Sequence, residues 1–191
     1  MGKDTTYYRR ILFEFISITF AVILGFIVTE CNDNRKQRIE AQKSLTFILQ
    51  ELRDNKVNLE YHQKYYTTII YNIENLDTNE VKTEYLSDIP GWRGITPPLI
   101  QNSAYELALQ TGSLKHLNSE LVHQLAKINA TYEAFNDFIR SSVDFATLDE
   151  YQSSIDYNMR LIYRYNEYSN IYLNTLNKLA KNQEIDWEKY E

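Results

Sequence analysis

Apolar residues recur every three or four positions along three long stretches of the chain. This spacing places them on one face of a helix and is typical of helices that pack nearly parallel or antiparallel. Polar Asn55 and His62 interrupt the first stretch. We interpret His62 as a hydrogen-bonded residue that sets helix register; the alternative is a protonation switch. We therefore predict an all-α protein made of long helices. The positions are Leu45, Ile48, Leu52, Leu59, Tyr66, Ile69, Ile73 and Leu76; Leu121, Leu125, Ile128, Tyr132, Phe135 and Ile139; and Leu148, Tyr151, Ile155, Ile162, Tyr165, Tyr172, Leu176 and Leu179.

Residues 11–29, ILFEFISITFAVILGFIVT, form an apolar run in which Glu14 is the single charge. As a helix rising about 1.5 Å per residue, this run covers the roughly 30 Å hydrocarbon core of a bilayer. We predict a tail at 1–10, a transmembrane helix at 11–29 and a soluble helical bundle domain at 30–191. The alternative is a cleaved signal peptide, but the run exceeds a usual signal core and lacks a small-residue cleavage pattern.

The charges that flank the span favour a cytoplasmic C-terminal domain. Three basic residues precede the span within the tail, and four follow it within 30–44. The later cluster predicts a single-pass protein of the cell membrane with its bundle inside. The 30–44 region carries no helix breaker, so we expect the span to continue unbroken into the first soluble helix. The basic residues are Lys3, Arg9 and Arg10 before the span and Arg35, Lys36, Arg38 and Lys43 after it.

Within the span, one charged residue and a series of small residues are candidates for membrane and oligomer contacts. Glu14 either pairs locally with Arg9 or Arg10 near the headgroups, or faces a helix bundle or aqueous lumen in an oligomer. Ser17, Ala21 and Gly25 recur every four residues, a spacing that permits close helix contact. This ridge favours self-association of the spans, so we expect a homo-oligomer.

Composition narrows the class of protein. A length of 191 residues suggests one domain with at most one appendage, and only 5 glycines and 3 prolines argue against sandwiches and barrels. A net charge of −6 argues against duplex DNA as a partner, and the one cysteine excludes a disulfide framework or a cysteine-based zinc site. The 16 tyrosines are compatible either with plain packing in the core or with more hydrated interfaces between subunits.

All three prolines and two glycines fall in the segment from Pro90 to Pro98, PGWRGITPP. This composition predicts an ordered, turn-rich connector at 88–98. We expect a short helix at about 99–110 after it, ended by Gly112 in a left-handed conformation, and a cap for the next helix at Asn118 or Ser119.

The connector is the best candidate for a ligand site. Trp92 supplies a planar surface for stacking, and Arg93 beside it can fork onto phosphate or carboxylate. Arg160 and Arg164, one helical turn apart and close to tyrosines, form a second cationic and aromatic surface. Either patch could hold a small nucleotide. The alternative is that the arginines pair with carboxylates and Trp92 closes the end of the bundle. If the short helix folds back, four further ligand residues join the first patch: Asn102, Ser103, Lys115 and His116.

Other chemistry has little support. His116, Glu120 and His123 have metal-ligand spacing on a helix, but a cap at Asn118 would leave His116 outside that helix. No nucleophile elbow, phosphate-binding glycine loop or metalloprotease motif is present. We therefore expect no enzyme activity, no bound metal and no cofactor.

From Glu14 to Lys36, and again between residues 103 and 114, the chain is similar to a large uncharacterised bacterial family of single-span proteins. That family shows a Glu early in the span, an aliphatic run with glycine, and an Asn-rich exit that ends in Arg-Lys. The resemblance covers about a third of the chain, implies no activity, and is broken at Cys31, near the family's usual tryptophan. The matching residues are Glu14, Val22-Ile23-Leu24-Gly25, Asn32-Asp33-Asn34-Arg35-Lys36, Ser103-Ala104-Tyr105-Glu106 and Thr111-Gly112-Ser113-Leu114.

In layout alone, a span followed by a small helical domain also resembles the cyclic-oligoadenylate-responsive membrane effectors of type III CRISPR defence. That resemblance implies a ligand-gated effector whose bundles associate, bind a small anionic ligand such as a cyclic oligonucleotide, and re-pack the spans around Glu14. The alternative is a non-catalytic, membrane-anchored scaffold for a protein partner.

Overall fold

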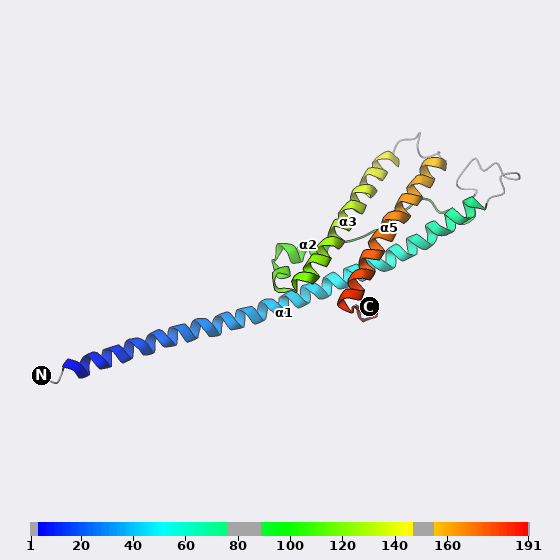
Figure 1. Cartoon of the computed structure of the whole chain (residues 1–191). Helices are drawn as coiled ribbons and strands as arrows, with labels where there is room; N and C mark the ends of the chain where they lie inside the picture. The colour runs from blue at the N-terminus through cyan, green and yellow to red at the C-terminus, as the bar shows by residue number, and fades with distance from the viewer. Residues whose placement is uncertain (1–3, 76–88, 147–154, 191) are drawn as a thin grey trace.

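A computed structural model describes residues 4–75, 89–146 and 155–190 (Figure 1). The described residues are helical or irregular and contain no strand, which confirms the all-α fold class. The long helix α1 comes first, and the other elements pack along its C-terminal half. In order, the elements are α1 (Asp4–Glu74), α2 (Ser103–Gln110), the 3-10 helix η2 (Ser113–His116), α3 (Ser119–Ala146), α5 (Ile155–Gln183) and the 3-10 helix η3 (Trp187–Tyr190).

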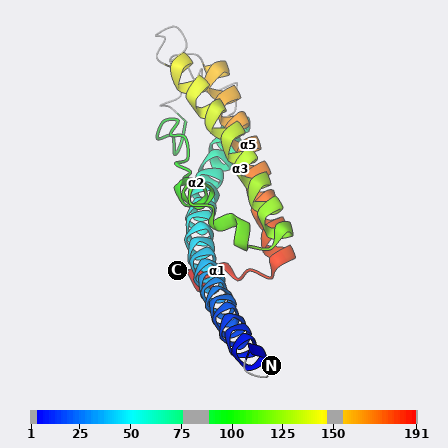
Figure 2. The ribbon, with the colours of Figure 1, turned by 90° about the vertical axis from the view of Figure 1, so that its left-hand side faces the viewer.

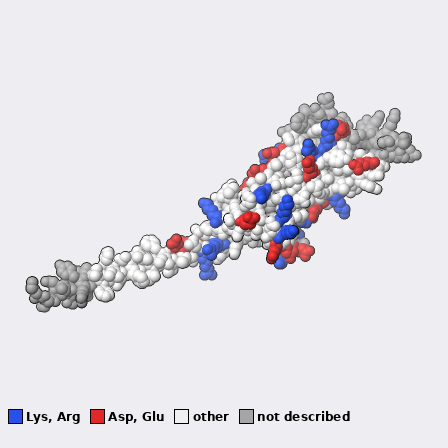
Figure 3. Space-filling model, viewed as in Figure 1, with Lys and Arg blue, Asp and Glu red and all other residues white. Residues whose placement is uncertain are grey.

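Helix α1 runs without a break for 71 residues, or about 107 Å at about 1.5 Å per residue. The expected continuation of the apolar run into the first soluble helix is therefore confirmed. The side chains from Leu12 to Glu40 are all exposed, and burial begins at Ala41. An 18-residue window in this uncovered part has a mean hydropathy of 2.3 and is long enough to cross a membrane. Figure 3 shows this stretch as white surface, whereas charges gather over the remainder.

The bundle consists of α3, α5 and the C-terminal half of α1. Helix α5 packs against both α1 and α3 and runs antiparallel to them, as two views at right angles show (Figures 1 and 2). The short α2 and η2 cover α1 at the end of the bundle nearest the apolar segment. After α5 the chain returns to α1 through η3.

The core contains the apolar helix faces predicted from the sequence, which are called the apolar seams below. Leu59, Ile69, Phe135, Ile162 and Leu176 are completely buried. Each lies on a three-to-four-residue repeat, so the periodicity identifies the packed face of each helix. Of the seam positions, Leu76, Leu148 and Tyr151 lie outside the described residues.

The interior tyrosines pack within a single chain. Tyr66 and Tyr165 stack with ring centroids 5.9 Å apart. Their hydroxyls find polar partners: Tyr66 donates to the carbonyl of Thr96, and Tyr165 shares a 2.7 Å hydrogen bond with Ser142. Burial raises the pKa of both phenols because it disfavours the phenolate. For these residues the structure favours core packing over a seam between subunits.

The turns and caps largely follow the sequence. Gly112 ends α2 with a φ of 73°, and the Asn118 side chain accepts a 2.8 Å hydrogen bond from the Glu120 amide at the start of α3. The expected start of the short helix at about residue 99 is wrong, because α2 begins at Ser103. Both backbone groups of Gln101 bind the Asn55 side chain, and residues 99–102 are irregular.

Candidate anion-binding site

The connector after residue 88 runs back along α1 and is attached to it by side-chain hydrogen bonds. A polar stripe on α1 donates to successive backbone carbonyls of the connector. The stripe also accepts hydrogen bonds near the start of α2, where Glu51 binds the Ser103 hydroxyl at 2.6 Å and the Ala104 amide at 3.1 Å. The stripe therefore fixes the path of residues 90–104. The donor and acceptor pairs are Asn72 and Pro90, Tyr65 and Gly94, Tyr66 and Thr96, Asn58 and Leu99, and Asn55 and Gln101.

The Tyr65 hydroxyl both accepts and donates a hydrogen bond to the connector. It accepts a 2.9 Å hydrogen bond from the Arg93 amide and donates a 3.0 Å hydrogen bond to the Gly94 carbonyl. Gly94 has a φ of 89°, a conformation that suits glycine and lets the connector turn at this point. The backbone of Arg93 is therefore held against α1.

The side chain of Arg93 lies on a tyrosine surface. Its guanidinium carbon is 4.9 Å from the centroid of the Tyr65 ring, and Nη1 donates a 3.4 Å hydrogen bond to the Tyr61 hydroxyl. A guanidinium group carries more N–H donors than these contacts use. None of the described carboxylates forms an ion pair with Arg93. The tyrosines therefore position this cation, and within the described part of the chain no carboxylate neutralises it.

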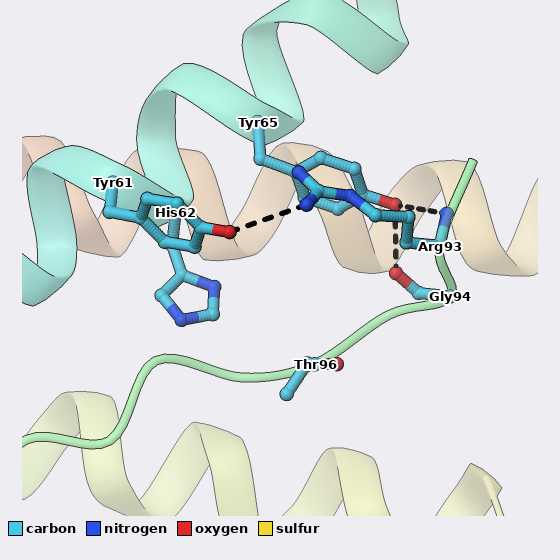
Figure 4. Close-up of a pocket in the computed structure, with 6 residues that line it drawn as sticks. All are labelled: Tyr61, His62, Tyr65, Arg93, Gly94 and Thr96. Atoms are coloured by element: carbon cyan, nitrogen blue, oxygen red, sulfur yellow. Dashed lines mark hydrogen bonds between the residues drawn. The ribbon is translucent and has the colours of Figure 1, made fainter. Parts of the chain in front are cut away.

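A cavity of about 240 Å³ opens beside Arg93. Figure 4 shows the α1 side chains on one side of it and the connector on the other, with the His62 imidazole pointing from α1 toward the connector segment that carries Thr96. Its lining consists of Tyr61, His62, Tyr65, Arg93, Gly94 and Thr96.

A second hollow of about 550 Å³ adjoins the first and shares Tyr61, Tyr65 and Arg93 with it. Lys64 and Trp92 contribute a further cation and a further aromatic surface. The predicted pairing of Trp92 with Arg93 is thus present in space.

His62 belongs to this site, although its position in the apolar seam suggested a register residue. Its ring contacts Tyr61 edge-on at 5.5 Å and Tyr66 at 6.0 Å. Partial burial lowers its pKa, because the imidazolium form loses solvation. The imidazole is therefore neutral near pH 7.

The structure does not bring the other predicted members of the connector patch to this cavity. Asn102 is buried, and its amide donates a 2.6 Å hydrogen bond to Asn129 on α3. Ser103 is bound to Glu51, and Lys115 and His116 lie exposed in η2. The short helix α2 contacts α1 around Phe47 and Glu51, which is N-terminal to the Arg93 cavity. It therefore does not fold back over Trp92.

Arg160 and Arg164 are each paired with a carboxylate of the same helix, α5. Arg160 pairs with Asp156 at 2.8 Å, and Arg164 pairs with Glu167 at 2.9 Å. Both arginine side chains are largely exposed, so these pairs contribute little to stability. At this second surface the structure matches the alternative in which each arginine is paired with a carboxylate.

The remaining predicted residues lie on the uncovered part of α1. Glu14, Ser17, Ala21 and Gly25 are exposed, and a Cβ atom added at Gly25 would meet nothing within 4 Å. Among the described residues, no group of three potential metal ligands comes together.

No protein-family model, curated protein or solved structure matches this chain. The two resemblances drawn from the sequence therefore stay predictions.

Proposed function

We propose that this chain is a membrane-anchored helical sensor or effector whose bundle binds a small anionic ligand at the Arg93 cavity. The observation that carries the proposal is the state of Arg93. Tyr61 and Tyr65 hold it in place, and no described carboxylate neutralises it. A fixed cation among aromatic rings is suited to an oxyanion attached to a flat group.

The second support is the position of the site on α1. Tyr61, His62 and Tyr65 belong to the same unbroken helix as the apolar segment 11–29. About 36 residues separate Gly25 from Tyr61, which is about 54 Å of helix. We propose that ligand binding changes how the bundles associate, and that α1 carries this change to spans packed along Ser17, Ala21 and Gly25.

Binding is tested with full-length protein in lipid nanodiscs, by calorimetry against nucleoside monophosphates, cyclic mononucleotides and cyclic oligonucleotides. We expect saturable binding that Arg93→Gln weakens and Arg164→Gln leaves unchanged. The control fits because Arg164 already has a carboxylate partner on its own helix. Absence of binding across the panel, together with unchanged leakage of liposomes that contain the protein, would refute a ligand-gated effector.

The proposed topology is a single pass through the cell membrane with the bundle in the cytoplasm. Cys31 is exposed, lies two residues after the end of the apolar run and is the one cysteine of the chain. A membrane-impermeant maleimide should label it in inverted vesicles but not in intact spheroplasts. Labelling in spheroplasts would reverse the orientation, and recovery of the intact chain in the aqueous fraction would remove the anchor.

A non-catalytic scaffold is the second candidate, favoured by an apolar surface between α1 and α2. Phe47 is 61% exposed and Leu107 is 59% exposed, and both line a hollow of about 270 Å³. Apolar patches of this kind often bind protein partners. This function predicts a partner that Phe47→Asp releases and that ligands of the Arg93 cavity do not affect.

A further inference from the structure

The lining of the Arg93 cavity distinguishes between classes of anion. Arg93 supplies a positive charge and N–H donors that none of the described residues engages. His62 supplies a neutral imidazole, which can accept a proton from a ligand as well as donate a hydrogen bond to it. The cavity therefore combines a permanent cation with an imidazole whose pKa is lowered by burial.

We propose that this cavity binds a phosphate monoester, with Arg93 on two of its oxygens and His62 sharing one proton with the bound phosphate. The inference rests on the proposed anion-binding function and deepens it by naming the ligand class. A monoester has a second pKa of about 6, so its phosphate can carry a hydrogen that a neutral imidazole accepts. A phosphodiester or a cyclic nucleotide has no such hydrogen near neutral pH.

Few other groups in the described part of the chain can compete for this proton. The titratable neighbours of the imidazole on α1 are Tyr61, Tyr65 and Tyr66, and the connector contributes Arg93. Tyr165 on α5 stacks on the Tyr66 ring, and Tyr66 in turn contacts the imidazole. Burial raises the pKa of Tyr66 and of Tyr165, so neither phenol releases a proton near pH 7. The charge that favours the bound dianion therefore comes from Arg93, from the proton that His62 takes up and, in the adjoining hollow, from Lys64.

The proton gives a measurable signature. At pH 7 to 8 the free imidazole is neutral and a free monoester is mainly a dianion, whereas the complex holds one proton between them. By linkage, affinity should fall about tenfold for each unit of pH increase in this interval. Below about pH 6 the free ligand already carries the proton, so the dependence should level off.

The experiment is calorimetry on the full chain in nanodiscs, in two phosphate-free buffers that differ in ionisation enthalpy. The probes are AMP, glucose 6-phosphate, 3′,5′-cyclic AMP and adenosine. We expect both monoesters to bind with uptake of close to one proton, and the cyclic diester and the nucleoside to bind at least tenfold more weakly. The difference between the binding enthalpies in the two buffers gives the number of protons taken up. This measurement uses the unaltered protein, so it does not depend on whether a variant folds.

Variants then assign the roles. His62→Gln should abolish proton uptake and flatten the pH dependence, while Arg93→Gln should weaken monoester binding by about ten- to a hundredfold. Arg160→Gln removes an equal charge from α5 and should change neither quantity. Equal affinity for cyclic AMP, or binding without proton uptake, would overturn the monoester inference but leave an anion sensor. Failure of every phosphate compound to bind would overturn both.

Discussion

Asn55→Ala should destabilise the bundle strongly, because one buried side chain joins α1, the connector and α5. Asn55 is 2% exposed. Its amide donates to the Gln101 carbonyl at 2.7 Å and to the Tyr172 hydroxyl at 3.3 Å, and its oxygen accepts from the Gln101 amide at 2.8 Å. Each of the two bonds to Gln101 contributes about 1 kcal/mol. Leaving the buried Tyr172 hydroxyl without this partner adds about 1 kcal/mol, for a total of about 3 kcal/mol.

The assay is chemical unfolding of the full chain followed by far-ultraviolet circular dichroism, with amide hydrogen exchange as a local readout. The Gln101 amide should exchange much faster in the variant, since it loses its acceptor. Asn177→Ala is the matched control, because Asn177 is an exposed asparagine in α5 and its replacement should change stability by less than about 0.5 kcal/mol. A loss below about 1 kcal/mol for Asn55→Ala, with unchanged exchange at Gln101, would refute this account.

Other changes test the core, the interior phenols and the anchor. Ile162→Ala removes a completely buried side chain and should cost about 2–5 kcal/mol of unfolding free energy in the same assay, whereas truncating the exposed Leu107 should cost far less. Burial raises the pKa of Tyr66 and Tyr172 above their ordinary value of 10.0, so stability should be complete below pH 10 and fall as the pH rises further; ionisation of every tyrosine in a still-folded bundle would contradict this. Phe20→Arg places a charge near the middle of the apolar run, at a cost of about 2.5–3.5 kcal/mol, and should reduce recovery of the chain in the membrane fraction.

The fold was largely predictable because burial in long helices follows their periodicity. Polar residues within the apolar repeat were also informative, and Asn55 is an example. A polar residue on a buried helix face needs hydrogen-bond partners. For Asn55 these partners are the backbone of Gln101 and the Tyr172 hydroxyl. The start of α2 could not be predicted in the same way. Local propensity allowed a helix from residue 99, and a side chain 46 residues away in the sequence prevents it.

The site was only partly predictable. The sequence pointed to Trp92 and Arg93 because a rigid, proline-rich segment presents a stacking group beside a cation. It did not identify Tyr61, His62 and Tyr65 as the opposite wall, because no local signal shows that the connector runs back along α1. A usable signal was the recurrence of polar residues on one face of α1, at positions 51, 55, 58, 62, 65 and 72, beside the apolar seam.

The position of the cavity follows from that polar stripe. Asn58 binds the Leu99 carbonyl and Tyr65 binds the Gly94 carbonyl, and His62 lies one helical turn from each along α1. Opposite His62 the connector contributes Thr96 to the cavity lining, and the Thr96 carbonyl already accepts a hydrogen bond from the Tyr66 hydroxyl. The backbone acceptor nearest the imidazole is therefore occupied by a neighbouring side chain of α1. The ring is left facing the cavity, and Arg93 supplies the charge that selects an anion.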